Sequence, residues 1–135
     1  MTIDGEIRGA VEDCARRSHE GAISFGEAVG ELVEIGVEAY FADYRRRETI
    51  YYFPSGATTA IALETPPIAI PEAFDAGAVR RAVLGAQSGV VQYREFMRLT
   101  MAAGCSGYFV WIAGRHVAYF GRRGETHVEH FPGAR

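Results

Sequence analysis

Residues 36–52, GVEAYFADYRRRETIYY, and residues 104–120, GCSGYFVWIAGRHVAYF, are two versions of one pattern, 68 residues apart. The same offset, without gaps, aligns residues 9–63 with residues 77–131, and 12 of the 55 aligned pairs are identical. Composition alone predicts roughly four or five identities. An internal repeat constrains the architecture before any single element is considered. We therefore expect two pseudo-symmetric halves sharing one core, within a single domain over residues 1–135.

Each half is predicted to contain two helices followed by three short strands. Residues 4–18 place apolar side chains at helical spacing behind Asp4, a typical N-cap. The second helix begins with a capping box at Ser24–Glu27 and ends at Gly36. The alternation then changes to β-branched and aromatic residues, which predicts an α+β fold with antiparallel meanders and helices packed on one face. The predicted strands cover residues 37–44, 48–53, 57–63, 106–112, 115–120 and 125–131.

Composition and charge exclude several classes of protein. The chain is 48% hydrophobic and 12% aromatic, which is too rich in both for a disordered chain. It has no apolar run of the ~18 residues that a membrane span needs, and its start lacks the pattern of a signal peptide, so we expect a cytoplasmic protein. The formal net charge of −3 argues against nucleic acid as the main ligand. Cys14 and Cys105 have no metal-binding spacing, and Cys14 lies on an apolar helix face, where we expect a buried, inert thiol.

The charges are unevenly distributed between the halves. Residues 1–67 hold 12 acidic residues and 6 arginines, a net of −6, whereas residues 68–135 hold 5 acidic residues and 8 arginines, a net of +3. All 14 basic residues are arginines, and no lysine is present. The two halves are therefore electrostatically complementary, within one molecule or between two copies.

The second half also carries a family resemblance. The run GCSGYFV at residues 104–110, the run VAYFGRRGE at residues 117–125 and the closing Phe131-Pro132 resemble the YdfO/YbcV-like family of small bacterial and prophage proteins, whose members are often labelled "phage envelope protein". The resemblance covers most of the chain and fits the order of helices and strands. It implies the fold and an absence of known activity, it offers no established catalytic residues to transfer, and an origin in a prophage is an expectation that accompanies it.

The second meander carries the candidate binding face. If its hairpins pair in the simplest register, with Ala113-Gly114 and Arg122-Arg123 at their tips, Tyr108, Val110 and Val117 point into the core. His116 then lies opposite Glu129. The face that points away from the core is predicted to comprise Phe109, Trp111, His116, Phe120, Glu125, His127 and Glu129, because strand side chains alternate.

The histidines and carboxylates of this face allow two interpretations. Two histidines and two carboxylates are suitable for a divalent metal or for acid–base chemistry. Alternatively, they form ordinary cross-strand polar pairs on a half-exposed sheet. The first half has Glu48, Ala57, Thr59 and Ile61 at the equivalent positions, and no H-E-x-x-H motif occurs. We therefore assign no metal, cofactor or catalytic residue, and a small metal-dependent or acid–base enzyme remains the alternative function.

The aromatic residues of the strands favour a binding function. Phe41, Phe109, Trp111 and Phe120 either cover one another between the meanders or form an exposed patch, and such patches mark a partner or a ligand groove. A homodimer through this patch is one prediction, with charge pairing between the acidic stripe from Glu27 to Glu38 and the helix residues Arg94 or Arg98. The sequence thus favours a non-catalytic binding or interaction module, whose partner is a second copy, another protein or a small molecule.

Overall fold

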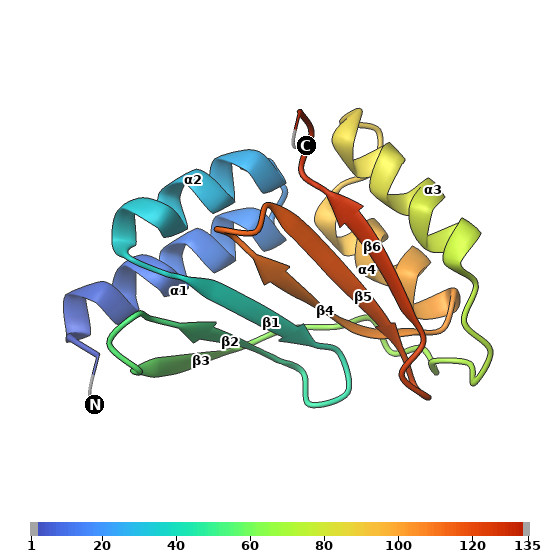
Figure 1. Cartoon of the computed structure of the whole chain (residues 1–135), viewed down its shortest axis with the longest axis horizontal. Coiled ribbons are helices and arrows are strands. Elements are labelled where there is room, and N and C mark those ends of the chain that lie inside the picture. Colours follow the sequence, from blue (N-terminus) through green and yellow to red (C-terminus); the bar gives the residue numbers. More distant parts are fainter. Residues whose placement is uncertain (1–2, 134–135) are drawn as a thin grey trace.

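In the computed structural model, both halves contribute three strands to one antiparallel sheet. The structure describes residues 3–133, which contain four helices and a sheet with the strand order β3-β2-β1-β4-β5-β6 (Figure 1). The first strand of each half therefore lies at the centre of the sheet. The elements are α1 (Gly5–His19), α2 (Phe25–Ile35), β1 (Ala39–Asp43), β2 (Glu48–Tyr52), β3 (Thr58–Ala62), α3 (Ala76–Gln87), α4 (Tyr93–Ala102), β4 (Cys105–Trp111), β5 (His116–Gly121) and β6 (Thr126–His130).

Local signals in the sequence set the helix ends. The Asp4 carboxylate accepts a hydrogen bond of 2.7 Å from the backbone N–H of Glu6 at the start of α1. At the start of α2, Ser24 and Glu27 form both hydrogen bonds of the capping box. Gly36 ends α2 with a φ of 107°, a left-handed conformation that favours glycine. The predicted cap residues and the predicted α+β order of elements are confirmed.

The central strand pair is symmetric about two equivalent phenylalanines. Phe41 of β1 lies directly opposite Phe109 of β4, the residue 68 positions further along the chain. On either side, Tyr40 pairs with Val110 and Ala42 pairs with Tyr108. Position 42 corresponds to position 110, and position 40 to position 108, so the pairing is unchanged when the halves are exchanged. The predicted meanders are thus joined edge to edge through β1 and β4.

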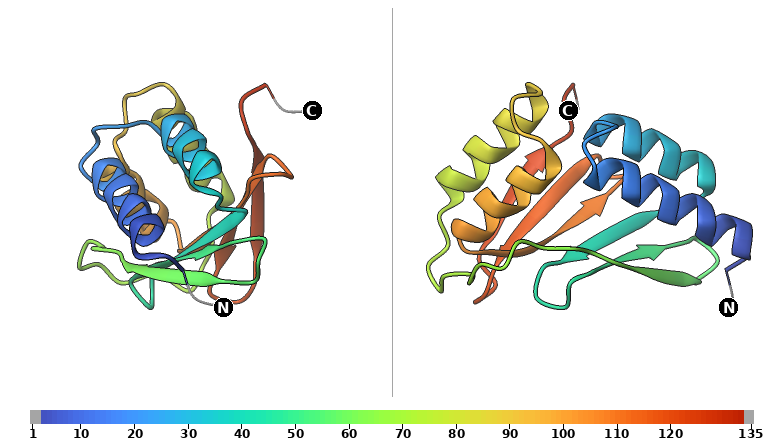
Figure 2. Two further views of the ribbon diagram at one scale, coloured as in Figure 1. Left: turned by 90° about the vertical axis from the view of Figure 1, so that its left-hand side faces the viewer. Right: turned by 180° about the vertical axis from the view of Figure 1, so that it is seen from behind.

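All four helices lie on one face of the sheet, as the side and rear views in Figure 2 show. The helix-covered face of the sheet contributes four buried tyrosines, which alternate with side chains on the other face. Residues from both halves form one hydrophobic core between the helices and this face. No helix of the described residues covers the opposite face, which we call the open face. The four buried tyrosines are Tyr40, Tyr51, Tyr108 and Tyr119.

The predicted register of the last hairpin is wrong by one residue. His116 pairs with His130 instead of Glu129, and Val117 pairs with Glu129. The cause is the turn, because Gly121 N–H donates to the carbonyl of Glu125 and Gly124 adopts a φ of 87°. This is the longer loop in which a left-handed glycine adds one residue to the turn, rather than a two-residue turn. A shift of one residue moves every side chain of β6 to the other face.

Candidate functional site

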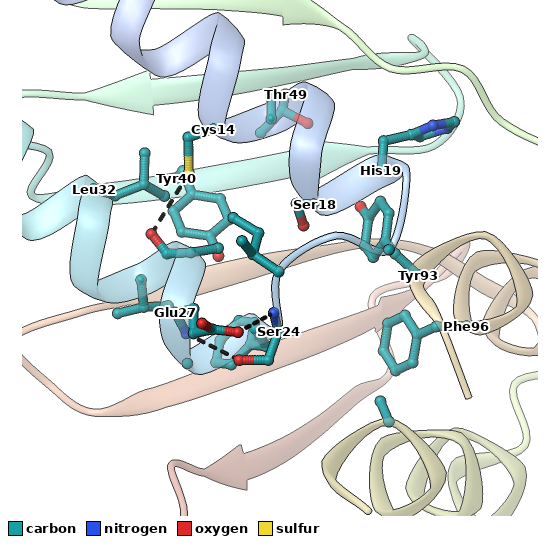
Figure 3. Close-up of a pocket in the computed structure, with 18 of the residues that line it drawn as sticks. Cys14, Ser18, His19, Ser24, Glu27, Leu32, Tyr40, Thr49, Tyr93 and Phe96 are labelled. Carbon is teal, nitrogen blue, oxygen red and sulfur yellow. Dashed lines mark hydrogen bonds between the residues drawn. The ribbon is translucent and has the colours of Figure 1, made fainter. Parts of the chain in front are cut away.

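A cleft of about 1300 Å³ lies between the helices and the sheet. The sheet forms its floor, α1 and α2 form one wall, and the start of α4 forms part of the other (Figure 3). The turn that joins α1 to α2 meets the turn that joins α3 to α4: a Cβ added at Gly21 would lie 2.6 Å from Oε1 of Gln92. The two helical hairpins therefore touch at their turns and enclose space beneath them. Cys14, Ser18, Leu32, Tyr40, Thr49 and Phe96 border this space.

Hydroxyl groups are the main polar groups on the floor of the cleft. Tyr108 and Tyr93 share a hydrogen bond of 2.8 Å between their hydroxyl oxygens. The hydroxyls of Tyr40, Tyr51 and Tyr119 make no such bond within residues 3–133. In this same part of the chain, no fully enclosed side-chain oxygen or nitrogen lacks a partner. Each of these three hydroxyls therefore keeps some accessible surface, and all three side chains border the cleft.

Burial keeps the floor and its neighbouring thiol uncharged. Desolvation raises the pKa of Tyr93 to about 12 and raises the pKa of Tyr40 well above its ordinary value of 10.0. It also raises the pKa of the Cys14 thiol to about 11, and the Cys14 Sγ lies 3.7 Å from the carbonyl oxygen of Ala28. At neutral pH these groups offer neutral donors and acceptors among apolar surfaces. A thiol in this protonated state is a poor nucleophile. Cys14 is also buried in the structure, as predicted.

Polar and aromatic side chains surround the edge of the cleft. The His19 ring lies 6.2 Å from the Tyr93 ring, edge to face, and His19 Nε2 lies 2.9 Å from the carbonyl oxygen of Glu64. On the α2 side, the rings of Phe25 and Phe131 meet edge to face at 5.6 Å. The floor of the cleft thus carries neutral groups, whereas polar groups in contact with water lie at its edge.

The structure divides the predicted binding face between the two sides of the sheet. Phe109, Trp111, His116 and Phe120 lie on the open face, as predicted, and the ring of His116 lies 6.0 Å from that of His130. The prediction is wrong for the remaining three residues. Glu125 lies in the β5–β6 turn, where it accepts a hydrogen bond from the backbone N–H of Arg123. His127 and Glu129 lie on the helix-covered side, because the register of β6 is shifted.

This division separates the residues of the alternative metal or acid–base site. His127 Nε2 and Glu129 Oε2 are 2.6 Å apart, so these two side chains hold each other beside the Tyr119 ring. His116 lies on the opposite face of the sheet. In the part of the chain that the structure describes, no three His, Cys, Asp or Glu residues form a group suitable for a metal ion. The predicted His/Glu cluster is therefore not assembled.

The rings of the open face pack mainly against one another. Phe109 is the centre of the row, with ring distances of 4.1 Å to Trp111, 5.7 Å to Tyr52 and 5.9 Å to Phe41. Among the large apolar side chains of the open face, Trp111 at the end of the row is 45% exposed and Val128 on the edge strand β6 is 44% exposed. The row is a half-buried apolar strip rather than a deep groove.

Two of the charged residues that we named for a dimer contact have partners within the molecule. Glu31, in the middle of the acidic stripe, binds Arg17 of α1. Arg98 binds Glu95, which lies one turn earlier on the same helix. Both helices lie on the side of the sheet opposite the open face. These two ion pairs therefore connect α1 to α2 and stabilise α4 on the helix-covered side.

The cleft was not predicted from the sequence. Ala28 corresponds to Phe96 in the aligned halves, which is the largest loss of side-chain volume on the inner side of the helices. This difference in side-chain volume can be read from the sequence. It indicates a cavity only when both positions are known to face the same side of the sheet.

The fold and the cleft define a small α+β protein with a helix-covered antiparallel sheet. Residues 15–129 match the family described as "Protein of unknown function (DUF1398)", and since the match covers most of the chain, the protein belongs to this family. No curated protein matches the sequence. Within residues 3–133, every helix is too short or too polar to cross a membrane.

Proposed function

We propose that this protein is a non-catalytic binding protein that holds a small, largely apolar molecule in the cleft between its helices and its sheet. The observation that carries the proposal is the cleft of about 1300 Å³ with three buried tyrosines whose hydroxyls have no partner in the described chain. Ligand sites are typically concave, mainly apolar and supplied with a few polar groups that fix orientation. The cleft has each of these properties.

Binding is favoured over catalysis because the groups on the floor of the cleft are neutral phenols, with a neutral thiol beside them. A general base or nucleophile needs a pKa near the working pH or a neighbouring base. Here burial raises the pKa of both Cys14 and Tyr93 to values several units above neutral. The four residues that favoured an enzyme are not assembled: His127 pairs with Glu129 on the helix-covered side, His116 lies on the open face, and Glu125 lies in the β5–β6 turn.

We also propose that the protein derives from a prophage, which is a narrower statement than membership of its family. The runs at residues 104–110 and 117–125 support it through their resemblance to the YdfO/YbcV-like proteins. This origin is independent of the proposed binding activity.

The test is a titration of the purified protein with N-phenyl-1-naphthylamine, a dye whose fluorescence increases in apolar surroundings. We expect saturable binding of one dye per chain. Two-dimensional NMR with the same dye should shift the amide signals of Leu32, Tyr40 and Thr49, which border the cleft. The indole N–H of Trp111, the only tryptophan, lies on the open face and is the internal control.

Two outcomes contradict the proposal. A linear, non-saturating dye signal would mean that the cleft holds no apolar molecule. Saturable binding that shifts Trp111 and leaves Leu32, Tyr40 and Thr49 unchanged would place the ligand on the open face instead.

A further inference from the structure

The two halves of the cleft have the same floor. Tyr40 and Tyr51 in the first half correspond to Tyr108 and Tyr119 in the second, and all four side chains are buried. The helices above them begin at equivalent positions, since α2 starts at Phe25 and α4 starts 68 residues later, at Tyr93. A side chain that lies above one floor and has no equivalent above the other therefore marks space that the protein does not fill with the same group.

In the second half, a phenyl ring from the protein fills the space above the floor. The Phe96 ring is stacked with Tyr93 at 6.3 Å, meets Tyr108 edge to face at 6.3 Å and lies 6.1 Å from Tyr119. Above the same floor, the Tyr93 hydroxyl completes the hydrogen bond of the Tyr108 hydroxyl. The second half thus contains a phenyl ring and a phenol group in contact with its two floor tyrosines.

In the first half, neither group is present. The position of Phe96 is taken by Ala28, and the position of Tyr93 is taken by Phe25, which has no hydroxyl. Phe25 is 40% exposed and packs against Phe131 at the edge of the cleft. The rings of Tyr40 and Tyr51 stack on each other at 5.4 Å, and the Tyr40 hydroxyl lacks the partner that the Tyr108 hydroxyl has.

The walls of the first half are also more polar. Thr49 replaces Val117, and Ser18 replaces Ala86, at equivalent positions that border the cleft. A purely aliphatic occupant would leave these hydroxyls and that of Tyr40 without hydrogen bonds in a dry site, which is unfavourable. A planar ring with one hydroxyl group covers the apolar surface and gives the Tyr40 hydroxyl a hydrogen-bond partner.

We propose that the occupant of the cleft is a planar aromatic molecule with a hydroxyl group, and that its ring takes the place in the first half that Phe96 fills in the second. The ring lies beside Ala28 and above Tyr40 and Tyr51, and its hydroxyl exchanges a hydrogen bond with the Tyr40 hydroxyl. This inference rests on the proposed binding function and adds the chemical class of the ligand and its position.

The test uses 2-naphthol as the probe, with two comparison compounds, in isothermal titration calorimetry on the full chain. Decahydro-2-naphthol has the same carbon skeleton without aromaticity, and naphthalene lacks the hydroxyl. We expect 2-naphthol to bind at least tenfold more tightly than either. The Tyr40→Phe variant should lose this advantage over naphthalene, while its affinity for naphthalene stays within a factor of two.

Ala28→Phe supplies the missing ring. This variant should fold, melt at a higher temperature than the wild type and bind 2-naphthol at least tenfold more weakly. Val33→Phe is the matched control, because it adds the same ring to α2 at a position that is 52% exposed; it should bind like the wild type. The converse change, Phe96→Ala, should raise the stoichiometry from one 2-naphthol per chain to two.

The outcomes separate this inference from the proposed function. Binding of N-phenyl-1-naphthylamine with no preference for 2-naphthol over decahydro-2-naphthol would overturn the aromatic ligand and leave the binding function standing. An Ala28→Phe variant that binds 2-naphthol like the wild type would overturn the position of the ring. One that fails to fold would do the same, because it would show that no space exists beside Ala28. If neither dye nor naphthol binds the wild type, the proposed function itself fails.

Discussion

Replacing Phe96 with alanine tests whether this ring supports the second half of the fold. The side chain is 6% exposed, and its ring contacts three tyrosine rings at 6.1 to 6.3 Å. Deleting a buried phenylalanine side chain typically costs about 3–5 kcal/mol, because apolar contacts are lost and a cavity remains. The whole free energy of unfolding of a domain is about 5–15 kcal/mol. We therefore expect Phe96→Ala to remove a large share of the stability.

Phe25→Ala is the matched control, since Phe25 occupies the same turn of the equivalent helix and is 40% exposed. Its ring has one aromatic neighbour, Phe131, and we expect a loss of about 1 kcal/mol. The measurement is urea unfolding followed by far-UV circular dichroism. With an m-value of about 2 kcal/mol per molar, the midpoint should fall by about 2 M for Phe96→Ala and about 0.5 M for Phe25→Ala. Equal shifts would refute the reasoning, because they would show that Phe96 is no better packed than an exposed ring.

Three further predictions concern a pair of glycines, a thiol and an ion pair. Gly36→Ala and Gly104→Ala should each cost about 1–2 kcal/mol in urea unfolding, because both positions have left-handed backbone. Gly104→Ala should cost a further 1–3 kcal/mol, roughly, because its Cβ would lie 2.0 Å from a linker carbonyl oxygen whereas the surroundings of Gly36 are empty; equal losses would contradict this contact. Cys14, with its pKa raised to about 11, should react with iodoacetamide at pH 8 far more slowly in the folded protein than in urea, as measured by mass spectrometry of its peptide. Similar rates in both states would mean that the thiol is accessible. The hydrogen bond from Arg17 lowers the pKa of Glu31 below its ordinary 4.5, so this pair stabilises the folded state above that pH and the contribution is lost as the pH falls through the lower, folded-state pKa. The melting temperatures of wild type and Glu31→Gln should therefore differ at neutral pH and converge in acid; a gap that persists in acid would assign the effect to packing.

The parts of the fold that could be predicted are those set by neighbours in the sequence. The capping box at Ser24–Glu27 and the left-handed Gly36 each act within one turn of chain, so their residues identify them directly. The β5–β6 register could not be predicted in the same way. Gly121 and Gly124 are compatible with both a two-residue and a longer turn, and the choice between them depends on hydrogen bonds that the sequence does not state.

The candidate site was harder to predict, because it depends on contacts between distant segments. Nothing local in β1 or β4 indicates that these two strands pair with each other and place Phe41 opposite Phe109. Without that pairing, Tyr40 and Tyr108 belong to separate meanders, and a cleft shared by both halves is not visible. The occurrence of Ala28 at the position equivalent to Phe96 then cannot be distinguished from ordinary variation between repeats, and it does not indicate an unfilled space in the first half.

The open face leads to the last prediction, which is that two copies associate through it. The face carries a row of stacked rings that ends at Trp111, which is 45% exposed, and no helix of residues 3–133 covers it. A second copy is the partner we expect, because a two-fold dimer brings the same apolar patch of each copy together. A two-fold axis parallel to the strands places the first half of one copy, with its net −6, against the second half of the other, with its net +3.

Sedimentation velocity over a dilution series measures this association directly, and the emission of Trp111 reports on the same face. We expect a dimer at high concentration, with a blue-shifted emission that moves to longer wavelength on dilution as the indole returns to water. Val128→Glu should give a monomer at every concentration, because a carboxylate buried in an apolar contact without a partner is costly. Val90→Glu, which adds the same charge at an 81% exposed position beyond α3, should dimerise like the wild type. A wild-type protein that sediments as a monomer throughout the series would show that the rings of the open face need no cover beyond the contacts they make with one another.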